Sequence, residues 1–339
     1  MDSLKGSVEL DLLRVGFIGC GRHATKVLFP CLHLAKMDLA AVCDVNEARA
    51  ARNARWFGAE RAYTDHRRML EEEPLDAVLI CTGLQTHARL TLDVIERGLP
   101  VFVEKPPAVT LAEAVHIREA SERAGVPVMV GTMKRHALIY RRLKETIDQP
   151  AFGPVSAVQA RMAVGWKNGS GFALLLDMGI HAIDQVLWQM GPVKSVQAMV
   201  RTLRKPIQVD DNAVILLEFA RSRALGYIEV GWTSPSGFSG VEIMGDKGCI
   251  VENYAGQLTV TTGKITPDMK KRAKMTTRVV DAEPTHGGWQ IEIGEVVKAF
   301  KQNSDLGMGI DTGGAALAVA LAARESSRTG KAVPVRAVK

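Results

Sequence analysis

Short apolar runs alternate with helical patterns over the first part of the chain. The apolar runs fall at residues 15–18, 39–43, 77–81, 101–103 and 126–130. Continuous apolar strands of this kind are buried on both faces, which is typical of a parallel sheet covered by helices. The pattern predicts an α/β domain over residues 1–132, with the doubly wound parallel sheet of a Rossmann fold.

The pattern changes after Thr132. A helical stretch at 136–147, a strand-like run at 155–164 and a helix around Asp177 come first, and longer strands with alternating polarity follow. Such alternation favours an open, mainly antiparallel sheet with one covered face. We expect an α+β domain over residues 133–339, for substrate binding and oligomerisation, whose last helix, at about 312–328, could pack back on the first domain. The expected strands lie at residues 193–203, 213–219, 225–233, 240–244, 249–252 and 258–262, and the other helix at 289–301.

Composition and charge narrow the class of protein. The chain has 339 residues, 47% hydrophobic and 24% charged, and a net charge of +6. A chain of that length is longer than a single hydrophobic core usually supports, so we expect two domains. The basic residues are scattered, and the densest run, around Lys270, lies in a polar stretch, so we expect no nucleic-acid partner. No segment is long and apolar enough for a membrane span, and five widely spaced cysteines suggest reduced thiols, so we expect a cytoplasmic protein.

Asp177 and His181 form a candidate acid/base pair. Four residues separate the carboxylate from the imidazole, which places both on one face of a helix. An imidazole beside a carboxylate can accept a proton near neutral pH. The alternative is a structural histidine near a helix start, with Asp177 as an N-cap or first-turn acid.

A glycine pattern follows the first expected strand. Gly19, Gly21 and Ala24 fit Gly-x-Gly-x-x-Gly/Ala between a strand and a helix, the context in which this pattern indicates dinucleotide binding. Gly19 permits a tight turn, Gly21 lets a pyrophosphate approach the backbone, and the helix N-terminus faces the phosphates. Arg22 and His23 lie in the same loop and are included in the cofactor site.

Two later strand ends add cofactor candidates. Asp44 ends the next strand, where an acid accepts hydrogen bonds from the adenosine ribose and disfavours a 2′-phosphate. NAD is therefore favoured, although Arg22 could accommodate NADP. Asp44 could instead be a turn residue. Thr82 and His87 follow the strand at 77–81. Thr82 could touch the cofactor, and His87 either does so or supports the helix start.

Lys105 stands in a third motif, Glu104-Lys105-Pro-Pro, at the end of the strand at 101–103. With this element, the glycine pattern and the Asp177 to His181 run, the chain resembles the Gfo/Idh/MocA family of nicotinamide-dependent oxidoreductases. The resemblance covers residues 14–335. It implies that Lys105, Asp177 and His181 are catalytic and that Lys105 also contacts the cofactor. It further implies that Glu104 supports the part of the site that binds the cofactor.

Some positions depart from the family pattern. Gly83 stands where relatives often have proline, and Lys134 lies in a segment where they carry an Asn-Arg-Arg type element. We expect Lys134 to reach the substrate. Trp166, in a glycine-rich connection, could stack on nicotinamide or a sugar ring, or be a tryptophan at the edge of the core.

The resemblance implies an NAD(P)-dependent dehydrogenase or reductase acting on a secondary alcohol or ketone of a small polyhydroxylated substrate: a sugar, sugar derivative or inositol. His181 would act as acid/base and Lys105 would stabilise the alkoxide. We expect no metal ion in the site, and we expect the chain to form a homodimer or homotetramer. Two alternatives stay open: an NAD-retaining glycoside hydrolase or eliminating enzyme that oxidises its sugar transiently, and a non-catalytic dinucleotide-binding regulator.

Overall fold

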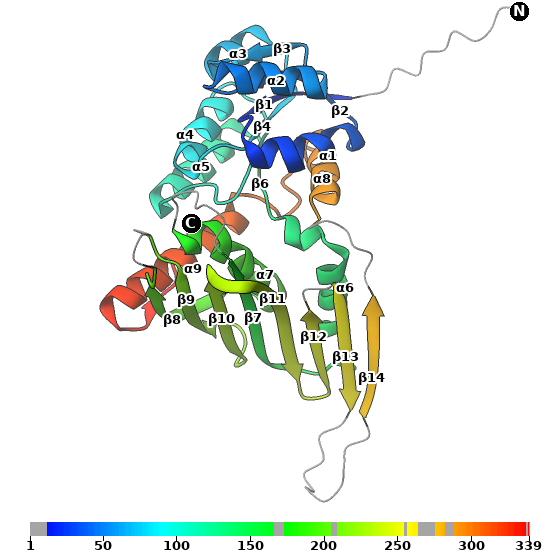
Figure 1. Ribbon diagram of the computed structural model, residues 1–339, viewed down its shortest axis with the longest axis vertical. Coiled ribbons are helices and arrows are strands. Elements are labelled where there is room, and N and C mark those ends of the chain that lie inside the picture. Colours follow the sequence, from blue (N-terminus) through cyan, green and yellow to red (C-terminus); the bar gives the residue numbers. More distant parts are fainter. Residues whose placement is uncertain are drawn as a thin grey trace, which may run out of the picture.

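The computed structural model describes residues 12–165, 173–204, 209–253, 256–263, 275–281, 288–336 and 338. Two sheets follow one another along the longest axis of the molecule, the first at the top of Figure 1 and the second below it. Over the described ranges, no helix is both long and apolar enough to cross a membrane.

The first sheet has six parallel strands in the order β3-β2-β1-β4-β5-β6. This confirms the predicted Rossmann sheet. Strand order reverses between β1 and β4, and ligands of such sheets bind at the carboxyl ends of the strands near this point. The strands are β1 (Leu13–Ile18), β2 (Met37–Cys43), β3 (Arg61–Tyr63), β4 (Ala77–Ile80), β5 (Val101–Val103) and β6 (Val128–Val130).

Helices from both halves of the chain cover this sheet. One core cluster joins Val15 and Phe17 of β1 to Ile293 and Val296, which lie on α8 far along the chain. Helix α8 packs against α1, so the second half of the sequence completes the first core. The helices are η1 (Ala24–Leu28), α1 (Phe29–Leu34), α2 (Glu47–Phe57), α3 (His66–Glu72), α4 (Leu84–Ile95), α5 (Leu111–Ala124) and α8 (Trp289–Lys301).

The second sheet has nine strands in the order β14-β13-β12-β11-β7-β10-β9-β8-β15. Among the described strands of this second sheet, only β7 and β10 pair in parallel, which confirms a mainly antiparallel sheet. The strands are β7 (Val155–Gly165), β8 (Val193–Arg201), β9 (Asn212–Phe219), β10 (Leu225–Gly231), β11 (Thr233–Gly245), β12 (Gly248–Asn253), β13 (Gln257–Gly263), β14 (Met275–Asp281) and β15 (Val333–Pro334).

Helices pack on one face of the second sheet. Ile215 and Leu217 of β9 are buried on this face, whereas Leu216 between them is 52% exposed on the other. Helix α9 contacts α7 and β8 and also α5 and β6 of the first half. Because this helix packs on both halves, the domain boundary at residue 132 stays a prediction. The remaining helices are η2 (Met133–His136), α6 (Leu138–Ile147), η3 (Leu175–Gly179), α7 (Ile180–Met190) and α9 (Ile310–Thr329).

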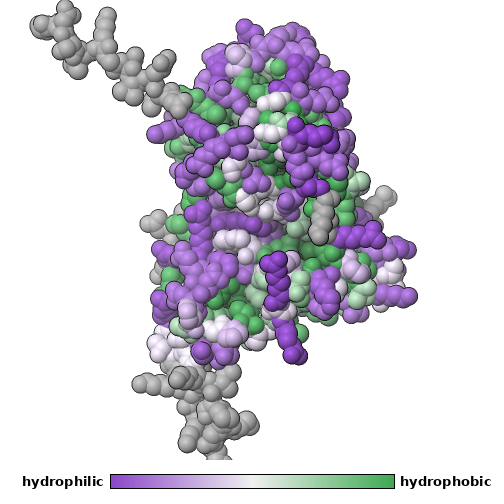
Figure 2. All heavy atoms as spheres, turned by 180° about the vertical axis from the view of Figure 1, so that it is seen from behind, coloured by the Kyte–Doolittle hydropathy of each residue, from purple (hydrophilic) through white to green (hydrophobic). Residues whose placement is uncertain are grey.

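The open face of the second sheet carries several apolar side chains. Met199, Leu225 and Met244 are exposed, and strand register places them on the same face as Leu216. Seen from behind, hydrophilic residues cover most of the surface around the first sheet, and hydrophobic residues reach the surface mainly lower down (Figure 2).

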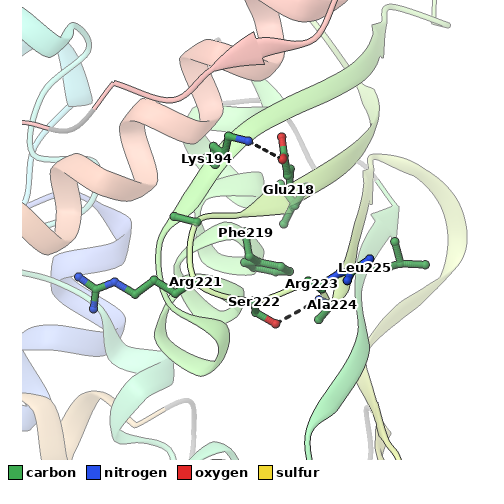
Figure 3. Close-up of a pocket in the computed structure, with 10 residues that line it drawn as sticks. Lys194, Glu218, Phe219, Arg221, Ser222, Arg223, Ala224 and Leu225 are labelled. Carbon is green, nitrogen blue, oxygen red and sulfur yellow. Dashed lines mark hydrogen bonds and ion pairs between the residues drawn. The ribbon is translucent and has the colours of Figure 1, made fainter.

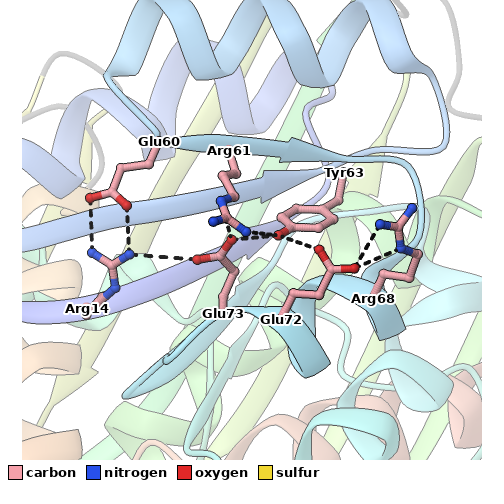
Figure 4. Close-up of polar contacts among 7 residues, drawn as sticks. All are labelled: Arg14, Glu60, Arg61, Tyr63, Arg68, Glu72 and Glu73. Carbon is pink, nitrogen blue, oxygen red and sulfur yellow. Dashed lines mark hydrogen bonds and ion pairs between the residues drawn. The ribbon is translucent and has the colours of Figure 1, made fainter.

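A polar network links strands β1, β2 and β3 of the first sheet. Arg14, in β1, donates to Asp38 at 2.9 Å. It also donates to Glu60 at 2.8 Å, and the Tyr63 hydroxyl donates to the buried Glu73 at 2.6 Å (Figure 4). Because the strands are parallel, their carboxyl ends lie at the edge opposite to Arg14. The contacts of Arg14 therefore lie on the far side from the glycine loop, whereas Tyr63, the last residue of β3, pairs in register with Cys43 at the carboxyl end of β2.

Candidate active site

The glycine loop has the geometry that its sequence predicts. Gly19 has a φ of +106°, and a Cβ there would lie 2.0 Å from the backbone oxygen of Cys81, at the end of β4. A Cβ on Gly21 would have no atom within 4 Å, so space is open above this residue. Ala24 is fully buried in η1. The loop can therefore admit a pyrophosphate beside its backbone.

Asp44 fastens the glycine loop to the end of β2. Its Oδ2 accepts a hydrogen bond from the Cys20 amide at 2.8 Å, and its Oδ1 accepts one from the Asn46 amide at 2.8 Å. The side chain is largely buried, whereas Arg22 and His23 are exposed at the start of the following helix. The three side chains thus surround the loop on which a dinucleotide would lie.

Glu104 is a buried carboxylate at the end of β5. Its Oε2 accepts from the Lys105 amide at 3.1 Å, and its Oε1 lies 3.4 Å from Nε2 of His23. Burial by itself would raise the pKa of Glu104, but the hydrogen bond and charge of His23 and the charge of Lys105 lower it overall. The carboxylate therefore stays ionised and holds the Lys105 segment against the glycine loop.

His87 connects two loops at the carboxyl edge of the sheet. Its Nδ1 lies 2.8 Å from the backbone oxygen of Pro106, and its Nε2 lies 3.2 Å from that of Thr82. The ring is buried, and burial lowers the pKa of this histidine. These contacts correspond to the supporting role considered for His87, while its ring also lines the cavity described below.

Lys105 joins the two halves of the candidate site. Its Nζ donates to the backbone oxygen of Asp177 at 2.8 Å and lies 3.5 Å from the Asp177 Oδ1. Asp177 lies in the π-helical turn η3, and His181 follows in the first turn of α7. The lysine from the first sheet and the carboxylate and imidazole from the second half therefore lie together.

His181 is favoured in its neutral form. Burial lowers the pKa of His181 well below its usual value, and the positive charges of Lys105, Lys134 and His23 lower it further. A neutral imidazole has a nitrogen free to accept a proton from a bound group, while the nearby positive charge lowers its basicity.

Two cavities meet at these side chains. One has a volume of about 420 Å³, and the other, toward Lys134, Asp184 and Thr132, is a narrow gap of about 10 Å³. Lys105 and His181 line both, so they stand between the glycine-loop side and the Lys134 side. The residues that line the first cavity are His23, Cys81, Thr82, Leu84, His87, Glu104, Lys105, Pro106, Leu176, Asp177, His181 and Trp289.

Comparison with known proteins assigns the two halves of the chain. Residues 13–132 match the family described as an oxidoreductase family with an NAD-binding Rossmann fold, and residues 140–251 match the GFO/IDH/MocA C-terminal domain. The chain belongs to the Gfo/Idh/MocA family. Its first half is therefore an NAD-binding Rossmann domain, and the protein is an NAD-dependent oxidoreductase.

Relatives with assigned activities cover most of the chain. The sequence is 30% identical over 261 residues to myo-inositol 2-dehydrogenase of Thermotoga maritima, covering 73% of this chain and 77% of that protein. It is 31% identical to scyllo-inositol 2-dehydrogenase (NAD(+)) of Bacillus subtilis, covering 70% and 73%. The structure of levoglucosan dehydrogenase with NADH and L-sorbose superposes with a TM-score of 0.85 at 22% identity, over 96% and 99% of the two chains, a likeness that shows the fold alone.

Trp289 is a site residue that the sequence did not indicate. It is the first residue of α8, and its ring meets that of His23 edge-on, with centroids 6.0 Å apart. More than two hundred residues separate Trp289 from His23, so no local sequence pattern could predict this contact. Trp166 and the basic run around Lys270 lie outside the described residues. In the part of the chain that is described, no group of three or more His, Cys, Asp or Glu side chains could hold a metal ion.

A larger hollow, of about 620 Å³, lies at the turn between β9 and β10. Lys194 pairs there with Glu218 at 2.7 Å, and Arg221 points away from the other side chains (Figure 3). None of the site residues predicted from the sequence lines it. The cavity of about 420 Å³ that Lys105, Asp177 and His181 line is therefore the candidate active site.

Proposed function

We propose that this protein is a dehydrogenase or reductase that transfers a hydride between NAD(H) and a secondary alcohol or ketone of a sugar, sugar derivative or inositol. One observation carries the proposal: Lys105, Asp177 and His181 line a single cavity together with residues of the dinucleotide-binding loops. The names of the inositol dehydrogenases that the chain resembles support the substrate class.

The proposed mechanism assigns each of these side chains a step. Bound NAD supplies the hydride acceptor. His181, neutral for the reasons given above, takes the hydroxyl proton of the substrate. Lys105 places a positive charge beside the developing alkoxide and, in reverse, beside the carbonyl oxygen. Asp177 fixes Lys105 through the contacts at 2.8 and 3.5 Å and can also bind a neighbouring hydroxyl.

The cofactor site that we propose contains Gly19 and Gly21 for the pyrophosphate and Asp44 for the adenosine ribose. An acid at the position of Asp44 repels a 2′-phosphate, so we favour NAD, while Arg22 leaves NADP possible. The nicotinamide end would lie among the residues that line the first cavity, namely His23, Thr82, His87, Glu104 and Lys105.

Lys134 and oligomerisation complete the proposal. Lys134 lines the narrow gap of about 10 Å³ beside Lys105 and His181, and we propose that it contacts a substrate hydroxyl or carboxylate from there. A homodimer or homotetramer could cover the exposed Met199, Leu216 and Met244 on the open face of the second sheet.

Turnover of a panel of inositols, sugars and sugar acids, with NAD and with NADP, tests the proposal. We expect NADH formation with at least one polyol, and we expect His181→Asn to abolish it while NAD binding persists. Full turnover by that variant would contradict the mechanism. Cofactor that copurifies and is never consumed would indicate the hydrolase or eliminating alternative. Tight NAD binding with no turnover of any panel member would indicate a regulator.

A further inference from the structure

One ion pair ties the helix that carries His181 to the segment that follows the first sheet. Arg135, on η2, donates to the carboxylate of Asp184, on α7, from two of its nitrogens. The Arg135 Nε lies 3.1 Å from Oδ1 and 3.0 Å from Oδ2, and its Nη2 lies 2.6 Å from Oδ1. Such a bidentate contact fixes the orientation of the carboxylate as well as its distance.

The pair of Arg135 and Asp184 is buried. The two side chains are 14% and 8% exposed. Burial raises the pKa of Asp184, and the charge and hydrogen bonds of Arg135 oppose this rise. The attraction within a buried ion pair often does little more than offset the cost of taking both charges out of water. Stability alone is therefore a weak explanation for the pair.

His181 lies between two anchored positions of the chain. Asp177 stands four residues before it and Asp184 three residues after it, so each is about one helical turn away. The Lys105 Nζ binds the backbone oxygen of Asp177 at 2.8 Å. His181 and Asp184 line the same narrow gap beside Lys105. The backbone that carries the imidazole is thus held on one side by Lys105 and on the other by Arg135.

The helical turns around His181 depend on contacts with other elements. The N-cap of η3 is Leu174 and that of α7 is Gly179, and neither makes a side-chain hydrogen bond to its helix. A start of this kind lacks the local polar contacts that usually fix the first turn of a helix. The ion pair from η2 supplies such a contact from outside.

The segment that carries Arg135 is itself fixed to the first half of the molecule. Just before η2, the Gly131 amide donates to the backbone oxygen of Val103, at the end of β5, at 2.9 Å. At the start of α8, a Cβ on Gly288 would lie 2.2 Å from the backbone oxygen of Met133, so this helix packs closely on η2. Arg135 therefore extends from a segment that is tied to the strand leading to the lysine of the candidate site.

We propose that Arg135 is a positioning residue that acts through Asp184. It sets the orientation of the first turns of α7 and so keeps the imidazole of His181 beside Lys105. Arg135 lines neither cavity, so it does not act on a bound substrate directly. Its effect on the His181 ring can be measured without substrate, whereas its effect on turnover rests on the proposed function.

Arg135→Lys tests the bidentate contact while it keeps the charge. An ammonium pairs with a carboxylate as a point charge and does not fix its orientation. We expect a melting temperature and NADH affinity close to wild type. We expect kcat to fall by about 100-fold, the loss that a displacement of about 1 Å at the reacting groups can cause. Arg14→Lys is the matched control, because Arg14 binds Glu60 through contacts of 2.8 and 3.2 Å far from the glycine loop, and it should leave kcat unchanged.

A double variant separates orientation from stability. Arg135→Met leaves the Asp184 carboxylate buried without its partner, so the melting temperature should fall. Adding Asp184→Leu removes that carboxylate, and an apolar pair of similar volume should restore the melting temperature. We expect kcat to stay low in the double variant although its stability recovers. Recovery of kcat together with the melting temperature would show that the pair serves stability only, and would overturn the proposal.

NMR of isotope-labelled histidine provides the measurement without substrate. The ring signal of His181 is identified by its loss in His181→Asn. We expect one narrow signal in wild type and in Arg14→Lys, and a shifted or broadened signal in Arg135→Lys, because the ring then takes several orientations. A wild-type signal in Arg135→Lys would overturn the proposal. If wild type turns over no member of the panel but Arg135→Lys still alters the signal, the proposed function fails and the positioning role stands.

Discussion

The Nζ of Lys105 donates a hydrogen bond of 2.8 Å to the backbone oxygen of Asp177 and lies 3.5 Å from its carboxylate. One residue follows a strand of the Rossmann sheet, and the other belongs to the helical turn that leads to His181. This contact places the proposed base beside the proposed alkoxide-stabilising charge.

Replacing Lys105 by methionine should therefore remove both the charge and the contact. We expect kcat to fall by about 100-fold or more, as when a group that stabilises an oxyanion is lost. NAD affinity, set mainly by the glycine loop, should change little. Steady-state kinetics and a fluorescence titration with NADH measure the two effects. Arg328→Met, which breaks an exposed ion pair with Glu325, is the control and should change neither kcat nor NAD affinity. Wild-type turnover by Lys105→Met would reject the assigned role.

Gly19 and Gly21 should respond differently to alanine. A Cβ at Gly19 would strike the Cys81 backbone oxygen from a left-handed backbone conformation, so Gly19→Ala should lower the melting temperature and abolish NAD binding. A Cβ at Gly21 meets no protein atom, so Gly21→Ala should fold with nearly wild-type stability and lose NAD affinity only. Thermal unfolding and NADH titration distinguish the two. Wild-type NAD affinity in Gly21→Ala would show that the space above Gly21 is not the cofactor's.

Asp44→Asn should shift cofactor preference. The amide retains the size of the side chain and one acceptor for the Cys20 or Asn46 amide, but it no longer repels a 2′-phosphate. We expect NAD affinity to fall by about tenfold, the loss of one good hydrogen bond to a charged group, and the NADP to NAD affinity ratio to rise. Competitive titration with both dinucleotides measures this ratio. If the variant binds NADP no more tightly than wild type does, Asp44 holds the glycine loop in place and does not determine the choice of cofactor.

Glu292, on α8, should make the protein less stable as pH rises. Its Oε1 accepts from the Thr132 amide, its Oε2 is buried without a partner, and burial, with the nearby Glu104 charge, raises the pKa of Glu292 well above its usual value. Above the ordinary glutamate pKa the folded state then holds a proton that the unfolded state has lost. The free energy of unfolding therefore declines with pH, by at most about 1.4 kcal/mol per pH unit.

Glu292→Gln retains the acceptor for Thr132 and cannot titrate, so this part of the pH dependence should disappear. Urea unfolding between about pH 5 and 8 should show wild type losing stability relative to the variant as pH rises. Glu325→Gln, at an exposed position, should preserve the wild-type slope. A difference between wild type and Glu292→Gln that is constant with pH would mean that Glu292 is ionised in the folded protein.

Much of the fold was predictable because each half has a strong local pattern. The helix Trp289–Lys301 has the predicted bounds, and Gly330 ends α9 in the left-handed conformation expected of a helix stop. Strand β3 was missed since two of its three residues, Arg61 and Ala62, are exposed and give no apolar run. Strand β11 extends well beyond the predicted 240–244, because the polar start at Thr233 carries no alternation.

The candidate site was predictable only where its residues are neighbours in sequence. The glycine loop and the Asp177 to His181 spacing are local, because a turn and a helix fix the relation of residues a few positions apart. Trp289 carries no such signal, since it reaches the site from α8, a separate element far along the chain.

The sequence by itself determined the two sheets, the family, and the candidate residues Lys105, Asp177 and His181, because polarity patterns and short motifs are properties of neighbouring positions. Only the tertiary structure decided that Lys105 pairs with Asp177, that Lys105 and Lys134 lie beside His181, and that α8 returns to complete the first core. Burial and charge at a site depend on which distant segments pack together, and that depends on the whole chain.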